Sequence, residues 1–156
     1  MTAPTVHFRR AAVADLDAIV ALLADDVLGT GREDPSVPAN PCYVRAFEAI
    51  DRDPNQLLAV AERAGAVVGC LQISFIPGLS RRGLWRGQIE SVRVASGERG
   101  AGTGRALFEW AIGQCRERGC GLVQLTTDKT RADARRFYES LGFAATHEGM
   151  KLELGA

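Results

Sequence analysis

The sequence predicts an α/β fold of the α+β type, with a single mixed, mostly antiparallel sheet and helices on both faces. Three consecutive strand-like segments, at 56–62, 66–76 and 84–94, are joined by short connections and are typical of an antiparallel meander. An amphipathic helical segment at 102–118 then leads to another strand-like segment at 122–127. Strand–helix–strand order predicts a parallel pair, so the sheet is expected to be mixed.

The chain before the meander predicts one strand and two helices. Residues 5–11 alternate between apolar and polar side chains and predict a short strand. Residues 15–28 predict a helix, because their apolar side chains recur at helical spacing. A stretch rich in Gly and Pro at 29–40 predicts a loop. It ends in Asn40 and Pro41, which are typical of a helix start and predict a second helix at 42–50.

The last part of the chain predicts a further helix and the end of the sheet. The "GCG" at 119–121 ends the amphipathic helix, since glycine is common just beyond a helix C-terminus. Residues 131–143 predict a short helix that ends at a glycine, and residues 144–154 predict one or two closing strands. The predicted order is therefore β-α-α-β-β-β-α-β-α-β(-β), in a single domain over residues 1–156.

The composition is that of an ordinary globular protein and argues against several function classes. Lys+Arg and Asp+Glu number 19 each, and zero net charge argues against bulk capture of nucleic acid or of an anionic membrane. No segment is apolar for long enough to span a bilayer, and the first ten residues lack an apolar run of the signal-peptide type, so a cytoplasmic protein is expected. The four cysteines and two histidines show no metal-ligand spacing, so no metal site is predicted.

The segment "ERGAGTGRAL", residues 98–107, packs three glycines into five positions before the amphipathic helix. Such a cluster indicates backbone N–H groups that face an anion. A triphosphate-binding loop requires G-x-x-x-x-G-K-[ST], and Thr103 stands where its lysine must be. A dinucleotide-binding loop requires G-x-G-x-x-G, and Gly104 comes one position early. A third ligand, the pyrophosphate of coenzyme A, fits the loop better.

Three ordered pieces of the chain resemble the GNAT family of N-acetyltransferases. These are "IESVRV" at 89–94, the R-G-x-G-x-G loop at 99–104, and "ADARRFYESLGF" at 132–143. The resemblance implies an acetyltransferase domain in which the fourth and fifth strands splay apart. It also implies acetyl-coenzyme A as donor, an amine as acceptor and, as often in this family, a homodimer.

The resemblance implies a set of residues that contact the coenzyme. The backbone of the fourth strand would face the pantetheine arm, and an N–H near Val92 would polarise the thioester carbonyl. The loop would hold the pyrophosphate, with Gly102 and Gly104 leaving room for the phosphates. An asparagine of many family members is replaced by Arg131, which can reach the coenzyme phosphates instead. The full predicted set is Val92, Val94, Arg99, Gly100, Ala101, Gly102, Thr103, Gly104 and Arg131.

Two residues are the candidates for catalysis. Tyr138 falls on the family position whose phenol protonates the departing thiolate, and the alternative is a packing role beside Phe137. Because a phenol has a pKa near 10 and a thiol near 8.5, the phenol keeps its proton at neutral pH and can donate it. Glu90 shares strand parity with Val92 and Val94, an apolar face where a carboxylate is unusual. It is interpreted either as the base that takes the ammonium proton or as the partner of an arginine in a buried ion pair, while solvent can also take that proton.

The acceptor site is expected around the loop between the first two helices and the connection before the fourth strand. Glu33 and Asp34 can hold an ammonium. Trp85 either walls the site or packs as an aromatic residue at the edge of the sheet. Three arginines can hold an acidic substituent: Arg81, Arg82 and Arg86. A long inter-helix loop tends to close the site, which favours a small-molecule amine. A protein N-terminal or lysine acetyltransferase and a non-catalytic coenzyme A-binding sensor remain as alternatives.

Overall fold

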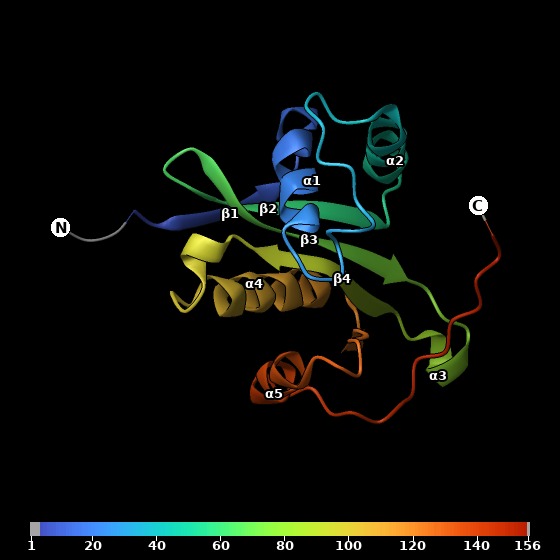
Figure 1. Ribbon diagram of the computed structural model, residues 1–156. Helices are drawn as coiled ribbons and strands as arrows, with labels where there is room; N and C mark the ends of the chain where they lie inside the picture. The colour runs from blue at the N-terminus through green and yellow to red at the C-terminus, as the bar shows by residue number, and fades with distance from the viewer. Residues whose placement is uncertain (1–3, 156) are drawn as a thin grey trace.

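The computed structural model describes residues 4–155 and contains one five-stranded sheet (Figure 1). Its spatial order follows the chain: β1 (Val6–Arg10), β2 (Gln56–Arg63), β3 (Ala66–Ile76), β4 (Arg86–Val94) and β5 (Leu122–Gln124). The first four strands pair antiparallel, and β4 pairs with β5 in parallel. The predicted meander and the predicted parallel pair are both confirmed.

Helices cover both faces of this sheet, as predicted. One face carries α1 (Leu16–Ala24) and α2 (Pro41–Arg52), and the opposite face carries α4 (Thr103–Glu117) and α5 (Ala132–Ser140) (Figure 1). The connection between β3 and β4 contains α3 (Ser80–Gly83), a single turn. No helix in residues 4–155 combines the length and the apolar character that a membrane crossing requires.

Two apolar cores follow from the alternation of side chains along the strands. The core toward α4 is formed by buried Leu57, Ala59, Ala61, Leu71, Ile73, Phe75, Ile89, Leu107, Phe108, Ala111 and Cys115. The core toward α1 and α2 is formed by buried Ala11, Leu16, Ile19, Val20, Leu22, Ala39, Phe47, Leu58, Val60 and Cys70. Full burial of one large aliphatic side chain stabilises the fold by about 1.5–3 kcal/mol, so these two layers carry most of the stability.

The helix boundaries depend on local capping. The side chain of Asn40 accepts a hydrogen bond from the Cys42 N–H at 3.0 Å, and Pro41 takes the first helical position of α2, as predicted. The expectation that the first helix continues to residue 28 is wrong, because α1 ends at Ala24. Val27 lies outside α1 with 93% of its surface exposed and cannot anchor another turn.

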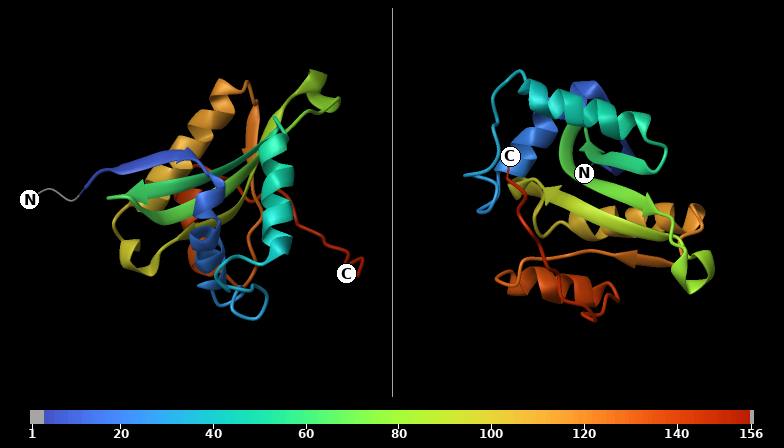
Figure 2. Two further views of the ribbon diagram at one scale, coloured as in Figure 1. Left: turned by 90° about the horizontal axis from the view of Figure 1, so that it is seen from above. Right: turned by 90° about the vertical axis from the view of Figure 1, so that its right-hand side faces the viewer.

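The predicted closing strands at 144–154 are absent from the part of the chain that the structure describes. This segment leaves the body of the molecule as a tail in Figure 1 and in the left view of Figure 2. Its alternating apolar residues Met150, Leu152 and Leu154 are 84–94% exposed. The alternation is that of a strand, but a strand also needs a partner along its length. β5 ends at Gln124 after three residues and offers little edge to pair with.

Candidate functional site

The sheet opens between β4 and β5. These strands pair only at Arg86↔Leu122, Gly87↔Val123 and Gln88↔Gln124, whereas β4 continues to Val94. Residues 89–94 therefore have no β5 partner, and we call this stretch with residues 125–128 the β4–β5 opening. The predicted splaying of the fourth and fifth strands is confirmed. Along the opening, backbone N–H and C=O groups of β4 are available to an extended ligand.

A β-bulge lies in β4 inside this opening. Gln72 pairs with Glu90 and Cys70 pairs with Arg93, so Ser91 and Val92 together oppose one residue of β3. Ser91 has a φ of +55°, a left-handed conformation that is rare outside glycine and concentrates at functional sites. Bulges interrupt the ladder and re-aim backbone groups, so a backbone N–H of this stretch is a candidate donor to a ligand.

The bulge changes the face on which Glu90 lies. Ile89 and Val92 both pack on the α4 core, and the two residues between them, Glu90 and Ser91, are exposed. The expectation that Glu90 shares an apolar face with Val92 and Val94 is therefore wrong, because the extra residue reverses the strand parity. The buried ion pair is also ruled out, since Glu90 is exposed and enters no salt bridge among residues 4–155.

Arg93 is a half-buried charge that no sequence motif marks. Its Nη2 lies 3.2 Å from Asp26 Oδ2, and both side chains are less than one-fifth exposed. Its Nη1 donates to the Val92 carbonyl at 2.8 Å. The pair ties β4 just past the bulge to the turn that follows α1. Only the bulge and the position of that turn bring Arg93 and Asp26 together, which local sequence patterns do not reveal.

The glycine loop leads directly into α4. Gly100 and Gly102 both have a φ of +81°, which glycine adopts without strain. Gly102 is the N-cap of α4 and has no side chain to satisfy the first N–H groups of the helix. Those N–H groups and the positive end of the helix dipole point out of the protein at the end of β4. Gly100, Ala101 and Gly102 are exposed, as is Arg99, and this arrangement suits a pyrophosphate.

Thr103 and Gly104 have structural positions at the start of α4. The Thr103 side chain is buried, and its hydroxyl donates to Glu98 Oε2 at 2.9 Å. Arg63 binds the same carboxylate, with its Nη2 at 3.1 Å, and so fastens the loop to β2. Thr103 can therefore offer a ligand its backbone N–H but not a free hydroxyl. A Cβ on Gly104 would lie 3.6 Å from Val94 Cγ2, an ordinary contact, so the protein itself leaves room for one.

Tyr138 stands on α5 in an aromatic cluster. Its ring lies edge-on to Phe108, Phe137 and Phe143, with centroid distances of 5.4, 5.6 and 6.2 Å. Burial raises the pKa of the Tyr138 phenol, and the charges of Arg131 and Arg93 offset part of this effect. The phenol is therefore protonated at neutral pH, and no hydrogen bond to another described residue affects its pKa. The aromatic cluster fixes the position of the Tyr138 ring, and the Tyr138 hydroxyl stays available to a ligand.

Two further groups border the opening. Thr127 has a buried hydroxyl without a partner among residues 4–155, and an unpaired buried hydroxyl usually has a ligand or water. Arg131 is exposed at the N-cap of α5, and its charge is close enough to affect the Tyr138 pKa. An orphaned polar atom, an uncapped helix start and an unpaired strand edge thus line one path from the loop to the last β4–β5 pair. This set fits coenzyme A.

The acidic residues of the inter-helix loop bind within the loop itself. Glu33 Oε2 accepts from the Tyr43 hydroxyl at 2.8 Å, and that hydroxyl accepts from the Asp34 N–H at 2.8 Å. Asp34 accepts from Ser36 and Asn40, and the Ser36 hydrogen bonds lower the pKa of its carboxyl. These bonds order the loop and fasten it to α2. A role for Glu33 and Asp34 toward an ammonium stays a prediction.

Trp85 lies just before β4 and packs on the α4 side of the sheet. Its ring packs half-buried against the α4 core, and its carbonyl accepts from the Gly121 N–H at 2.8 Å. Trp85 thus belongs to the junction of β4 and β5 rather than to the face that carries Glu90.

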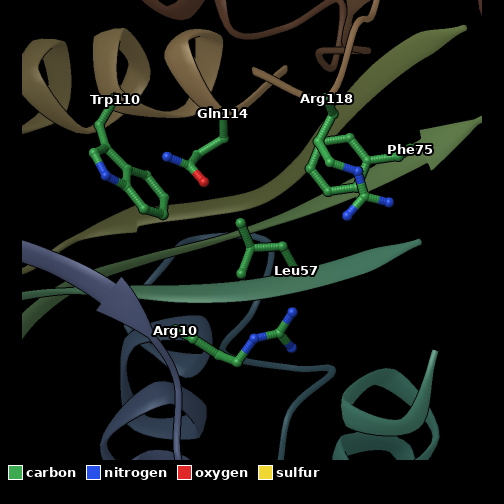
Figure 3. Close-up of a pocket in the computed structure, with 6 residues that line it drawn as sticks. All are labelled: Arg10, Leu57, Phe75, Trp110, Gln114 and Arg118. Atoms are coloured by element: carbon green, nitrogen blue, oxygen red, sulfur yellow. The ribbon is translucent and has the colours of Figure 1, made fainter. Parts of the chain in front are cut away.

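A cavity of about 270 Å³ opens elsewhere, where β1, β2 and β3 meet the end of α4 (Figure 3). It is lined by Arg10, Leu57, Phe75, Trp110, Gln114 and Arg118. Both guanidinium groups already have protein partners. Arg118 stacks on Phe75 at 4.3 Å and binds the Pro54 carbonyl, while Arg10 binds the Gln56 carbonyl. None of the predicted site residues lines this cavity. No group of metal-ligating side chains occurs among residues 4–155.

Comparison with known proteins gives consistent matches over most of the chain. The sequence matches the acetyltransferase (GNAT) family over residues 24–143. It is 30% identical to the aminoalkylphosphonate N-acetyltransferase of Salmonella typhimurium, over 92% of this chain and 88% of that protein. It is 32% identical to the streptothricin acetyltransferase of Streptomyces lavendulae, over 90% of this chain and 82% of that protein.

Solved structures match the fold closely. A transcriptional regulator from Bacillus halodurans superposes with a TM-score of 0.93 at 51% identity, covering 96% of this chain and all of that one. A putative acetyltransferase from Agrobacterium tumefaciens superposes with a TM-score of 0.83 at 27% identity, covering 94% and 99%.

Proposed function

The chain belongs to the GNAT family of acetyltransferases, and we propose that it moves the acetyl group of acetyl-coenzyme A to the primary amine of a small molecule. One observation carries this proposal. The β4–β5 opening has an uncapped helix start at one end and a bulged strand edge along its length. Tyr138 stands on α5 beside it. This arrangement suits the binding of a long, flexible ligand with phosphates at one end and a reactive thioester at the other.

The phosphate end of the coenzyme belongs at the glycine loop. The first N–H groups of α4 donate to the pyrophosphate, and the helix dipole favours its charge. Arg99 is exposed and in no salt bridge among the described residues, so it can add a charge-assisted hydrogen bond. Arg131 is placed to contribute in the same way from α5.

The reactive end belongs at the bulge. A backbone N–H at Ser91 or Val92 donates to the thioester oxygen and stabilises the negative charge that builds up there as the amine attacks, an effect commonly worth about 3 kcal/mol. Tyr138 gives its proton to the departing thiolate, so the leaving group departs as a neutral thiol. Its raised pKa keeps the phenol protonated until that moment, and solvent returns the proton afterwards.

Glu90 is the candidate acceptor for the proton of the attacking ammonium. It stands next to the bulge and is exposed, so it can act directly or through a water molecule. An amine must lose this proton before its lone pair can attack the carbonyl carbon. Because Glu90 is in contact with solvent, the proton can then leave the site.

A small acceptor is favoured over a peptide by the ordered inter-helix loop and by the relatives. The loop at 29–40 is fastened by Tyr43 and by a hydrogen bond from the Ala39 N–H to Asp17 at 2.7 Å. The relatives named above act on aminoalkylphosphonates and on streptothricin, and a third acts on glucosamine 6-phosphate. A homodimer stays part of the proposal.

The experiment is a thiol-release assay with acetyl-coenzyme A and a panel of small amines and lysine peptides. We expect turnover with small amines and an acetylated product that is heavier by one acetyl group. Tyr138→Phe should lower kcat about a hundredfold, because loss of a general acid costs two to four orders of magnitude. Its coenzyme affinity and melting temperature should stay as in the wild type. Unchanged kcat would remove Tyr138 as the acid, and the absence of coenzyme binding in calorimetry would overturn the proposal itself.

A further inference from the structure

A row of four polar residues crosses the sheet in exact register at the closed end of the β4–β5 opening. Gln56 of β2 pairs with Ser74 of β3, Ser74 pairs with Gln88 of β4, and Gln88 pairs with Gln124 of β5. Residues in register point their side chains to the same face of a sheet. This is the face of α1 and α2, because Leu58 has the parity of Gln56 and is buried in that core. We call these four residues the amide row.

The amide row is partly satisfied within itself and has hydrogen-bonding capacity left over. Gln56 Oε1 accepts from Ser74 Oγ at 3.0 Å and from Gln72 Nε2 at 2.9 Å, and Gln88 Oε1 accepts from Gln124 Nε2 at 3.0 Å. A carboxamide has two donors and one acceptor oxygen, so most of these groups still have free donors or acceptors. All four side chains are half-buried. The row therefore offers a rigid, neutral surface that suits hydroxyl or amide groups.

Opposite charges lie on either side of the amide row, along β4. Glu90 follows Gln88 by two residues, and Arg86 precedes it by two, so all three share one face. Neither charged group enters a salt bridge among residues 4–155. Their Cα atoms are about 13 Å apart, from a rise of about 3.3 Å per residue. The Arg86 guanidinium leans toward Gly78, in the connection that follows β3.

The amide row also lies where an acceptor must arrive. The Gln88–Gln124 pair is the last contact before the strands part, so the row borders the narrow end of the opening. The glycine loop lies at the other end of β4, which places the proposed thioester near the bulge and hence next to Glu90. An amine held at Glu90 would cross the row at Gln88, with its other end toward Arg86.

We propose that this face is the acceptor site, and that its acceptor is a small primary amine with hydroxyl or amide groups in its body and an anion at its far end. The proposal rests on the proposed function. Glu90 binds the ammonium, the amide row binds the polar body, and Arg86 binds the carboxylate, phosphate or phosphonate through its forked N–H groups. A long peptide or an apolar amine would leave these polar groups unpaired.

The test compares amines that differ only in the anion. Glucosamine 6-phosphate is paired with glucosamine, 4-aminobutyrate with butylamine, and aminoethylphosphonate with propylamine. We expect the best acceptor to be one of the anionic amines, and the three pairs to show which anion it carries. A lysine peptide or an apolar amine as the best acceptor would overturn the proposal.

The variant Arg86→Met then removes the guanidinium. It should lower kcat/KM for the best anionic amine by about ten- to a hundredfold, as loss of charge-assisted hydrogen bonds does. Turnover of the neutral counterpart should stay within about twofold, which also shows that the variant folds. Arg116→Met is the matched control, because Arg116 is exposed on α4 on the opposite face of the sheet. A preference for the anion that survives Arg86→Met would overturn the assignment of Arg86.

The two proposals fail in distinguishable ways. If coenzyme A does not bind in calorimetry, the proposed function fails whatever the amine. If the coenzyme binds and an amine is acetylated, but without preference for an anion, the function stands and the acceptor site proposed here is wrong. Gln88→Met tests the amide row separately. It should raise KM for the anionic amine and leave the coenzyme affinity unchanged.

Discussion

Residues 4–115 and residues 116–155 are held together in different ways. Every fully buried side chain that the structure describes belongs to the first region, and Cys115 is the last of them. The second region contains β5, α5 and the tail, and its side chains are half-buried or exposed. The first region contains the buried residues of both cores. The second region contributes only half-buried side chains, which pack against the α4 core.

The second region packs against α4 through an aromatic cluster. Phe137, Tyr138 and Phe143 all pack edge-on against Phe108, at centroid distances of 5.4 to 6.4 Å. Phe108 is fully buried on α4 and belongs to the first region. Beyond this cluster, β5 adds three paired residues to the sheet, and Val123, Leu125 and Leu141 also pack against the α4 core.

The proposed chemistry lies where the two regions meet. The first region supplies the bulged edge of β4 and the start of α4, and the second supplies Tyr138, Thr127 and Arg131. A ligand in the opening would contact both sides and add the burial that the second region lacks. Under the proposed function, the low burial of β5 and α5 marks the place where the coenzyme binds.

The largest expected effect is on the free energy of unfolding, when a leucine is replaced by alanine in each of the two regions. Leu71→Ala removes a fully buried side chain and should lower the free energy of unfolding by about 2–5 kcal/mol. Leu154→Ala changes a residue that is 90% exposed in the tail and should change it by no more than about 0.5 kcal/mol. Urea denaturation of both variants measures the difference. A large loss in Leu154→Ala would show that the tail packs on something in solution, such as a second copy of the chain.

A smaller effect is expected where the regions meet, in coenzyme binding. Gly104→Ala adds a Cβ at ordinary contact distance from Val94, in a helix where alanine is favoured by up to about 1 kcal/mol. The variant should melt at the same or a higher temperature. Its coenzyme A affinity should nevertheless fall about tenfold, or 1.4 kcal/mol, because the new methyl group approaches the phosphates.

Gly113→Ala is the matched control for this prediction. Gly113 lies in the same helix, and nothing is within 4 Å of the position of an added Cβ. It should raise the melting temperature in the same way and leave the calorimetric affinity for coenzyme A unchanged. Equal affinities in both variants would show that Gly104 does not serve phosphate binding.

The smallest effect concerns two thiols on either side of the boundary. Burial raises the pKa of the Cys115 thiol to about 11, and burial also raises the pKa of Cys120, which is only half-buried. Because the thiolate is the reactive form, alkylation at pH 8 should label Cys120 faster than Cys115. Labelling of Cys115 should continue to rise with pH up to about 11, where its thiolate becomes the main form.

Mass spectrometry of the alkylated peptides measures these rates. Cys42 is exposed and serves as the internal reference for full accessibility. In denaturant the thiols should react at similar rates. Equal rates for Cys115 and Cys120 in the folded protein would contradict the boundary drawn between the two regions.

Much of the fold could be predicted because its elements carry local signals. The helix start at Asn40 and Pro41 has the hydrogen bond that these residue types predict. The two left-handed glycines before α4 form the loop that the "RGAGTG" pattern predicts. The prediction of closing strands was wrong for a physical reason. Alternation at 150–154 is typical of a strand, but a strand also depends on hydrogen bonds to the edge of a sheet elsewhere in the chain.

The candidate site divides in the same way. The positions of Tyr138 and of the glycine loop follow from motifs that are contiguous in the chain. The face of Glu90 does not, because one extra residue at Ser91 reverses the parity and no local pattern marks this bulge. The role of the Thr103 side chain is likewise not local, because its hydroxyl binds Glu98, a carboxylate that Arg63 also binds from β2, and only its backbone N–H stays available to the coenzyme.

The sequence by itself determined the order of the main elements as far as α5, the family and the loop at the start of α4, since the signals for each are contiguous in the chain. The tertiary structure alone decided the bulge, the Arg93–Asp26 pair and the amide row. Gln56, Ser74, Gln88 and Gln124 lie far apart in the chain and form one surface only because the strands pair in this register. Register is set by packing across the whole sheet, and a shift of one residue would turn each of these side chains to the other face.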